Sequence, residues 1–149
     1  MAEIRRMREC DLDAVAAMEQ LIFSEPWSRR SFEETYLKRD NCYLVACEEG
    51  RVLAYCGLWG ISGEGDICNV AVHKDARRRG LAEAMLNELL KEGLAMGISS
   101  FTLEVRVSNA PAIALYHKLG FEDAGIRYDF YDKPREDALI MWKFSSNSH

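Results

Sequence analysis

The sequence predicts one α/β domain built around a mixed sheet, and three observations support this prediction. Stretches with the alternation of β-strands are interleaved with stretches of helical periodicity along the chain. The chain has 149 residues, with no internal repeat and no linker rich in proline, glycine or serine. Its residues are 48% hydrophobic and 29% charged, as in globular proteins. We therefore assign residues 1–144 to one domain and expect residues 145–149 to form a flexible tail.

The first half of the chain predicts one strand, two helices and three more strands. Residues 3–7 alternate enough for a strand, and the next helix begins at Asp11, a residue type that caps helices. Apolar residues recur in that helix at three- and four-residue steps: Leu12, Val15, Met18 (or Glu19) and Ile22. Ser28 caps a second, short helix that ends near residue 37. Three strands cover residues 42–46, 52–58 and 66–72, and glycines mark the turns between them: Gly50, Gly60, Gly63 and Gly65.

The second half predicts two helices and three strands. The longer helix covers residues 80–96, and its apolar face consists of one row with two residues beside it: Ala82, Leu86, Leu90 and Leu94, with Met85 and Leu89. Residues 101–107 alternate strictly between apolar and polar side chains, as in a strand with one buried face. A last helix covers residues 109–119. Two strands follow at 126–131 and 138–144, joined by a turn near a proline.

Composition and charge argue against several classes of protein. The formal net charge of −5 disfavours a nucleic-acid-binding protein and favours a cationic partner. No stretch approaches the ~20 apolar residues of a membrane span, and the first residues lack the apolar core of a signal peptide. We therefore expect a cytoplasmic protein. The five cysteines form no CxxC pair and are odd in number, which predicts reduced, mostly buried thiols.

The segment from Val70 to Ala82 has the pattern of an anion site. A strand ends there, a short polar turn follows, and an amphipathic helix begins at Gly80. The first amides of a helix have no partners within it, and the helix dipole adds about half a positive charge at that end. A glycine lets a diphosphate approach these amides, and the arginines at 77–79 raise the local potential. The segment therefore predicts a phosphate-binding corner, although a solvated turn with a flexible glycine would have the same composition.

A family resemblance starts from this corner. Arg77-Arg78-Arg79-Gly80-Leu81-Ala82 resembles the acetyl-CoA signature Gln/Arg-x-x-Gly-x-Gly/Ala of the GNAT acetyltransferase superfamily. It matches neither the ATP-binding pattern nor the dinucleotide pattern GxGxxG. Further segments resemble the ribosomal-protein-alanine N-acetyltransferases of the RimI type: Pro26-Trp27-Ser28, Leu103-Glu104-Val105-Arg106, Ser108-Asn109, Ala112-Ile113-Ala114-Leu115-Tyr116, Leu119-Gly120-Phe121 and Arg135-Glu136-Asp137-Ala138. The resemblance implies a GNAT fold, with a mixed, mostly antiparallel sheet of about seven strands and about four helices on its two faces.

The resemblance also implies a role for each matching residue. The residues expected to line or bind acetyl-CoA are Val70, Ala71, Val72, Arg78, Arg79, Gly80, Leu81, Ala82, Glu83 and Asn109. Glu104 would be the general base and Tyr116 the general acid. Each of these has a plainer alternative. Glu104 could be a solvent-facing strand residue and Tyr116 a packed helix aromatic, and Asn109 could cap its helix, which is compatible with a contact to the cofactor.

Transfer of an acetyl group to an amine explains why these residue types are needed. An α-amine has a pKa of about 7.7–8.0 and is largely ammonium at neutral pH, so a base such as Glu104 must take its proton, directly or through a water. The oxyanion that develops needs a donor, and a backbone N–H freed by a bulge near Val70–Ala71 is the candidate. Tyr116, with a reference pKa of about 10, can protonate the leaving thiolate. This chemistry requires no metal and no acyl-cysteine.

The acceptor is expected to enter between the turns at residues 23–28 and 128–134. Trp27, Tyr128 and Tyr131 could wall a slot for the first residues of a peptide, although Trp27 could instead be a packing residue between two helices. The leading hypothesis is a monomeric protein N-α-acetyltransferase whose acceptor is an N-terminal alanine of a small-subunit ribosomal protein. The alternatives are acetylation of a small amine or a lysine, a non-catalytic acetyl-CoA sensor, and a nucleotide-binding or structural domain.

Overall fold

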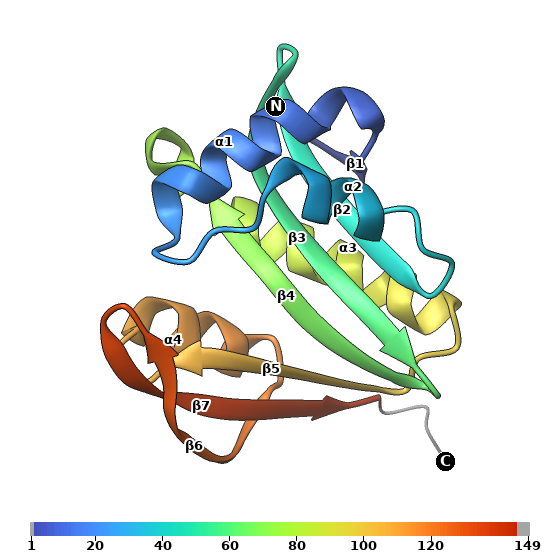
Figure 1. Ribbon diagram of the computed structural model, residues 1–149. Helices are drawn as coiled ribbons and strands as arrows, with labels where there is room; N and C mark the ends of the chain where they lie inside the picture. Colours follow the sequence, from blue (N-terminus) through green and yellow to red (C-terminus); the bar gives the residue numbers. More distant parts are fainter. Residues whose placement is uncertain (1, 146–149) are drawn as a thin grey trace.

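The computed structural model describes residues 2–145, which form a seven-stranded sheet with helices on both faces (Figure 1). The strand order is β1-β2-β3-β4-β5-β7-β6, and neighbouring strands are antiparallel except β4 and β5. The elements are β1 (Glu3–Arg6), α1 (Leu12–Ile22), α2 (Arg29–Thr35), β2 (Asn41–Glu48), β3 (Arg51–Ile61), β4 (Glu64–Val72), α3 (Leu81–Ala95), β5 (Ser100–Arg106), α4 (Ala110–Lys118), β6 (Glu122–Asp132) and β7 (Arg135–Phe144). This arrangement confirms the predicted fold class.

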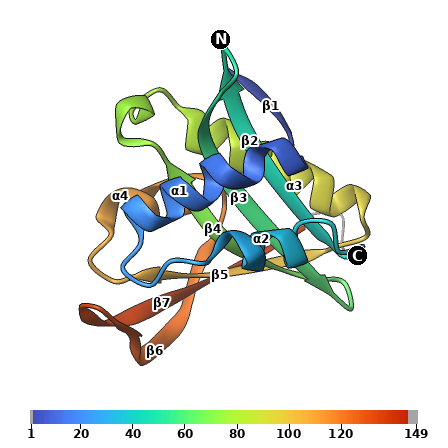
Figure 2. The ribbon, with the colours of Figure 1, turned by 45° about the horizontal axis from the view of Figure 1, so that its top comes forward.

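The helices form two layers on the sheet. Figures 1 and 2 show α1 and α2 crossing one face of β2–β4, with α3 behind them on the other face. The largest core cluster joins α3 and α4 to the sheet, and a second cluster lies under α1 and α2. No helix within residues 2–145 combines the length and the apolar character needed to cross a membrane. Of the expected tail, residues 146–149 lie outside the described chain, and the Ser145 N–H donates to Ser99 O at 2.8 Å.

Two of the four glycines expected in turns lie inside strands instead. Gly50 and Gly63 do occupy hairpin turns, where both turn residues have positive φ. Gly60 and Gly65, however, pair with each other in the β3–β4 ladder. A Cβ on Gly60 would lie 2.7 Å from Asp40 O, and one on Gly65 would lie 2.7 Å from a methyl group of Leu58. These two positions therefore require glycine for close packing and not for a turn.

The buried face of α3 differs by part of a turn from the predicted row. Its buried residues are Leu81, Met85, Leu86, Leu89, Leu90 and Gly93. The side chain of Leu94, predicted to be inside, is 47% exposed. A Cβ on Gly93 would lie 2.7 Å from Phe101 Cε1 and 3.0 Å from Leu58 Cδ2. The helix therefore makes its closest approach to the sheet at a glycine, which an apolar-periodicity argument does not count as a core position.

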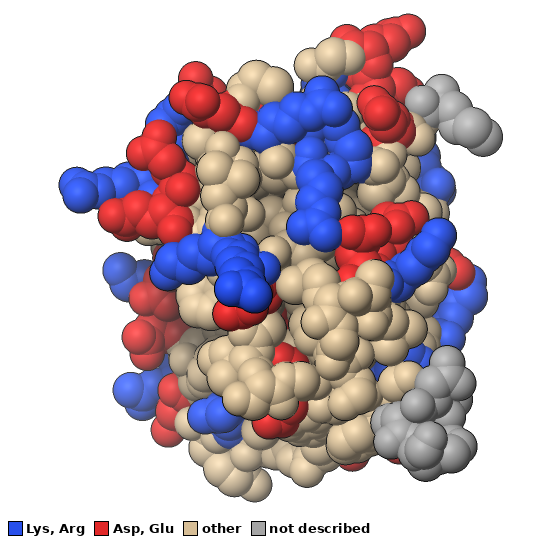
Figure 3. Space-filling model, turned by 90° about the vertical axis from the view of Figure 1, so that its right-hand side faces the viewer, with Lys and Arg blue, Asp and Glu red and all other residues tan. Residues whose placement is uncertain are grey.

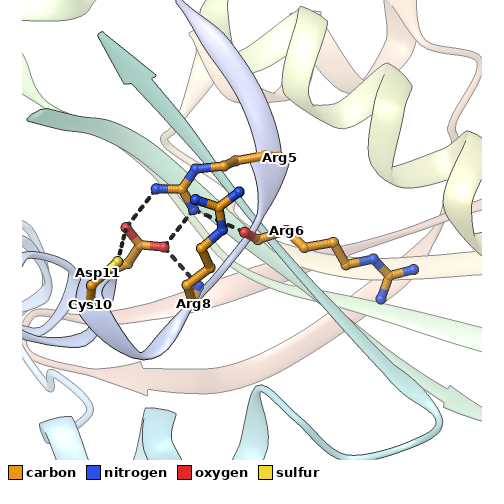
Figure 4. Close-up of polar contacts among 5 residues, drawn as sticks. All are labelled: Arg5, Arg6, Arg8, Cys10 and Asp11. Atoms are coloured by element: carbon orange, nitrogen blue, oxygen red, sulfur yellow. Dashed lines mark hydrogen bonds and ion pairs between the residues drawn. The ribbon is translucent and has the colours of Figure 1, made fainter. Parts of the chain in front are cut away.

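An ion pair joins β1 to the start of α1 (Figure 4). The guanidinium of Arg5 donates to both carboxylate oxygens of Asp11, at 2.7 and 2.9 Å, and the Arg8 N–H donates to Asp11 Oδ2 at 2.7 Å. Asp11 occupies the N-cap position of α1, but its side chain makes no capping hydrogen bond. The expectation that Asp11 caps the helix is therefore wrong, because Arg5 and Arg8 occupy the carboxylate. Burial alone would raise the pKa of Asp11, but these hydrogen bonds outweigh it and lower the pKa.

The boundary between β4 and β5 is short and parallel. Only Glu64–Asp66 of β4 face Ser100–Thr102 of β5 in the described ladder. Beyond this point the two strands diverge, as Figure 1 shows. The far part of β4 therefore has one edge paired with β3 and the other edge turned toward the fork between β4 and β5. Backbone polar groups along an unpaired strand edge are available to a ligand.

Candidate active site

The helix start that the sequence predicts at Gly80 is present at the beginning of α3. Gly80 is the N-cap residue, with φ of +74°, and α3 begins at Leu81. The first amide that bonds back along the helix belongs to Ala84, which donates to Gly80 O at 3.0 Å. The amides of Leu81, Ala82 and Glu83 precede it at the positive end of the helix dipole. A Cβ on Gly80 would meet no atom within 4 Å, so no neighbouring group crowds the backbone at this residue.

The arginines before Gly80 have different surroundings. Arg78 has φ of +67°, a left-handed conformation like that of Gly80. Arg79 Nη2 donates to both carboxylate oxygens of Glu48, at 3.1 and 2.8 Å, which ties this corner to the end of β2. Arg77 Nε donates to Val72 O at 3.3 Å. The backbone of the corner is thus held in place by its own side chains. We conclude that the residues present fit a diphosphate, with amides as the main donors.

The strand that precedes this corner contains the predicted bulge. Tyr55 pairs with Ala71, and Gly57 pairs with Cys68, so two residues of β4, Asn69 and Val70, oppose one residue of β3. Asn69 has φ of +55°, the left-handed conformation found in many bulges. The bulge begins one residue before the predicted position. It lies immediately before Val70–Val72, the segment expected to line the acetyl-pantetheine arm.

Glu104, the candidate base, lies on β5 and has a partner that the sequence did not indicate. Its neighbours Leu103 and Val105 point into the core with α3 and α4, so Glu104 points to the opposite face of the sheet. Arg127 Nε of β6 lies 2.7 Å from Glu104 Oε2. Asp66 of β4 pairs with Thr102, two residues before Glu104 on β5. Burial and then the charge of Glu104 raise the pKa of Asp66, while Arg127 lowers it. Glu104 is therefore a half-buried carboxylate in a small charged cluster.

Tyr116, the candidate acid, is buried on α4, with 7% of its surface exposed. Its ring contacts that of Phe121, with centroids 6.0 Å apart. Burial raises the pKa of Tyr116, with further contributions from Cys56 and Tyr131, so the phenol keeps its proton across the physiological range. Tyr131 of β6 also has a raised pKa, caused by burial and then by Glu104. The charge of Glu104 thus acts on the Tyr131 phenol, and Tyr131 in turn contributes to the raised pKa of Tyr116.

Three more predicted residues make contacts around α4 and the β6–β7 hairpin: Glu83, Asn109 and Tyr131. Asn109 accepts a hydrogen bond from the Ala112 N–H at 3.3 Å, so it caps α4 as its plainer alternative requires. Glu83 accepts from Lys118 Nζ at 2.8 Å, which fixes α4 beside the start of α3. The Arg106 guanidinium lies 4.3 Å from the centre of the Tyr131 ring and also donates to Pro134 O. These contacts hold α4 and the hairpin around the open end of the fork.

The three predicted wall residues do not form one cluster in the structure. Trp27 packs on Phe32 and Trp59, with ring centroids 5.2 and 5.8 Å away, as its packing alternative predicted. Tyr128 lies in an irregular part of β6 between Arg127 and Tyr131, and its side chain is 78% exposed. A contact of Trp27 or Tyr128 with an acceptor therefore stays a prediction. A shallow hollow of about 410 Å³ lies at the other end of the hairpin, beside Trp142 and Phe144.

The five thiols have the character expected of structural cysteines. All five are unpaired, and Cys42, Cys47 and Cys56 are buried. Cys68 lies next to the bulge, and burial raises its pKa to about 12, so its thiol stays protonated at neutral pH. Because the thiolate is the nucleophilic form, this environment favours direct attack by the amine over an acyl-cysteine.

Comparison with known proteins agrees with the geometry. Residues 12–121 match the Acetyltransferase (GNAT) family. The chain belongs to this family and is an acetyl-CoA-dependent N-acetyltransferase. The resemblance stated from the sequence is therefore confirmed, whereas the roles of single residues stay predictions.

Several of the similar proteins are named as ribosomal-protein-alanine N-acetyltransferases. A putative [ribosomal protein bS18]-alanine N-acetyltransferase of Bacillus subtilis is 40% identical over 145 residues, which cover 95% of this chain and 94% of the relative. The [ribosomal protein bS18]-alanine N-acetyltransferase of Escherichia coli K12 is 36% identical over 143 residues, covering 95% and 96%. The crystal structure of the ribosomal-protein-S18-alanine N-acetyltransferase from Escherichia coli superposes with a TM-score of 0.90 at 34% identity, covering 100% of this chain and 97% of that one.

Proposed function

We propose that the protein transfers the acetyl group of acetyl-CoA to the α-amine of a protein N-terminus, with the N-terminal alanine of a small-subunit ribosomal protein as the preferred acceptor. The observation that carries this proposal is the position of Glu104 and Tyr116. Tyr116 lies in the core on one face of β5, and Glu104 projects from the other face of the same strand. The names of the relatives supply the class of acceptor.

The corner at Gly80 serves the donor in this proposal. Amides at residues 81–83 hold the diphosphate, and the unpaired edge of β4 at Val70–Val72 is parallel to the acetyl-pantetheine arm. A backbone N–H of the bulge donates to the thioester oxygen, where negative charge develops. The acetyl-CoA contributes an activated acyl group, so the protein needs to orient it and to stabilise that charge.

Glu104 and Tyr116 move the protons. Glu104 accepts a proton from the acceptor ammonium, directly or through a water, and so produces the amine that attacks. Tyr116 keeps its phenolic proton because it is buried, and it donates that proton to the departing sulfur. Both reactants are bound together, so positioning within one complex supplies much of the acceleration.

The acceptor side is the surface between the α1–α2 segment and the β6–β7 hairpin. Its amine meets the Asp66–Glu104 pair, where two carboxylates favour a cation over a neutral group. The net charge of −5 attracts the basic chains that are common in ribosomal proteins. Charges of both signs are interspersed over the face shown in Figure 3, so this attraction comes from the whole molecule and not from that face. We propose that the enzyme acts in the cytoplasm as a monomer.

A peptide panel tests this function. Purified protein is incubated with acetyl-CoA and peptides that differ in the first residue and contain internal lysines, and the products are located by mass spectrometry. We expect acetylation of the α-amine of alanine-starting peptides and much less elsewhere, with Glu104→Gln as the negative control. Labelling of lysines alone, or of small amines and no peptide, would replace this acceptor class with another. Binding of acetyl-CoA without any transfer would instead favour a sensor.

A further inference from the structure

A buried glutamate in α1 takes no part in the chemistry described so far. The side chain of Glu19 lies between α1 and the sheet, and the residue is 3% exposed. Burying a carboxylate is costly unless hydrogen bonds replace the lost water. Its presence at a helix position that could hold an apolar residue therefore indicates a purpose other than packing.

Three donors from three segments converge on Glu19. The Trp27 N–H donates to Oε2 at 3.0 Å, and the Tyr55 hydroxyl donates to Oε1 at 2.7 Å. The side chain of Asn69 faces the same carboxylate and favours its ionised form. Burial raises the pKa of Glu19, and Trp27, Tyr55 and Asn69 act in the opposite direction. The carboxylate thus connects the α1–α2 segment, β3 and β4.

The hydrogen bonds beyond Asn69 have a fixed direction. The Trp59 indole can only donate, and it donates to Tyr43 Oη at 2.8 Å. The Tyr43 hydroxyl in turn donates to Asn69 Oδ1 at 3.1 Å. The Asn69 oxygen is therefore occupied, and its NH₂ group is directed to Glu19. Every proton in this chain points toward the carboxylate, so only an acceptor at position 19 satisfies all of them.

Asn69 connects this chain to the site of acyl transfer. It is the residue with φ of +55° in the β4 bulge, and Val70–Val72 follow it directly. A left-handed residue other than glycine is strained and persists only where the surrounding contacts fix it, so the geometry of Asn69 depends on what holds its side chain. Here Tyr43 holds one side of the Asn69 amide and Glu19 holds the other.

We propose that Glu19 is a positioning residue for acyl transfer, which acts by holding Asn69 and thereby fixing the bulge of β4 against the acetyl group. This proposal rests on the proposed function, in which the bulge supplies the oxyanion donor. Through the Trp27 amide, the same carboxylate also fixes the α1–α2 segment on the acceptor side. Glu19 thus couples the two halves of the site without touching either substrate.

Steady-state kinetics of two variants test this role. Glu19→Gln is isosteric but puts an NH₂ group against one of the three donors. Asn69→Gly keeps the left-handed backbone accessible and removes only the side-chain connection. We expect each to lower kcat by roughly 10- to 100-fold, with KM for acetyl-CoA changed less than about threefold. The double variant should be no slower than the worse single one, because the two residues act as a unit.

Tyr55→Phe is the matched control. It removes one hydrogen bond to the same carboxylate but leaves the ring and the Asn69 connection, so it should lower stability while kcat stays within about threefold of the wild type. Amide exchange of residues 66–72 provides a readout that needs no acceptor. It should become faster in Glu19→Gln and Asn69→Gly and stay near the wild-type rate in Tyr55→Phe.

The outcomes separate this inference from the proposed function. Full kcat in folded Glu19→Gln and Asn69→Gly, or unchanged exchange of residues 66–72, would overturn the positioning role while leaving the acetyltransferase intact. An equal loss of kcat in Tyr55→Phe would also overturn it, because general destabilisation would then explain the result. A wild-type protein that acetylates no peptide would contradict the proposed function alone, and the exchange measurement would still decide the role of Glu19.

Discussion

Arg127 and an incoming substrate compete for the same carboxylate. The ion pair between Arg127 Nε and Glu104 Oε2 has a separation of 2.7 Å, and the Arg127 side chain is largely exposed. In the proposed mechanism, an acceptor ammonium that gives its proton directly to Glu104 meets this guanidinium at the carboxylate. Exposed ion pairs contribute little to stability, about 0–1 kcal/mol, so the exchange is feasible. The pair therefore holds the Glu104 carboxylate in one orientation until the acceptor arrives.

Removing this competitor should improve acceptor binding. We predict that Arg127→Ala lowers KM for an alanine-starting peptide by about two- to fivefold, which corresponds to an exposed pair of about 0.5–1 kcal/mol. Steady-state kinetics with varied peptide measure the effect, and Arg127→Lys, which keeps a cation, is the control. A higher KM in Arg127→Ala would mean that the arginine contacts the acceptor instead.

The proton-transfer residues allow a more severe test. Glu104→Gln and Tyr116→Phe should each reduce kcat by about 10²–10⁴, because each removes a group that acts in the transition state. The affinity for acetyl-CoA, measured by calorimetric titration, should change little, since neither residue belongs to the Gly80 corner. Full turnover in both variants would contradict the proposed mechanism.

Sequence reasoning found residues that carry a local pattern and missed those that act across the sheet. Glu104 was indicated by the family resemblance of its segment, and Gly80 by its place at a strand-to-helix junction. Arg127 and Asp66 gave no such signal, because their closeness to Glu104 depends on which strands become neighbours. Glu19 gave a weak signal, because it falls at a position of the first helix where the apolar periodicity expects a buried residue.

At the scale of elements, the turn into α3 determines how the donor is held. Gly80 and Gly50 both have left-handed φ, +74° and +78°, and neither would bring a Cβ within 4 Å of another atom. They differ in location, because Gly50 lies in the β2–β3 hairpin. A substitution at either glycine should therefore cause similar backbone strain, but only Gly80 belongs to the proposed diphosphate site.

We predict that Gly80→Glu and Gly50→Glu each cost about 1–2 kcal/mol of stability through strain. Only Gly80→Glu should weaken acetyl-CoA binding, by roughly tenfold or more, because it places a carboxylate before the amides of residues 81–83. Thermal unfolding and calorimetric titration measure the two effects separately. Unchanged affinity in Gly80→Glu would mean that the diphosphate binds elsewhere.

Element boundaries were predictable where capping or turn chemistry is local. Ser28 accepts from the Ser31 N–H, and Asn109 caps α4, both as expected. The roles of Gly60, Gly65 and Gly93 were not predictable, because they reflect side chains and backbone brought near by the tertiary structure. The order of the last strands is a similar case. β7 returns between β5 and β6, and nothing within a hairpin specifies which of its strands pairs with the sheet.

For the molecule as a whole, two buried carboxylates give opposite dependences of stability on pH. Asp11 has a lowered pKa, so its contribution is complete above its ordinary value of 3.8 and is lost as pH falls below it. Glu19 has a raised pKa, so ionising it costs stability as pH rises from 4.5 through its folded value.

Two variants separate these contributions. We predict that Asp11→Asn lowers the free energy of unfolding by about 3 kcal/mol, by the same amount at pH 5 and pH 7. Glu19→Gln should become more stable relative to the wild type as pH increases from 4.5 to 7, because glutamine does not ionise. Urea unfolding at several pH values measures both. If Asp11→Asn loses more unfolding free energy at pH 7 than at pH 5, the ion pair with Arg5 must depend on a group that titrates in that range and not on Asp11.

The brevity of the contact between β4 and β5 has a mechanical consequence. Within the sheet, the half made of β1–β4 and the half made of β5–β7 are connected by three residue pairs at one end. Rotation about that end changes the opening of the fork with few hydrogen bonds broken. A ligand that contacts β4 and α3 on one side of the fork and α4 on the other connects the two halves of the sheet. At 100 times its dissociation constant such a ligand adds about 2.7 kcal/mol to the stability of the folded state, so we expect bound acetyl-CoA to raise the resistance of the enzyme to unfolding.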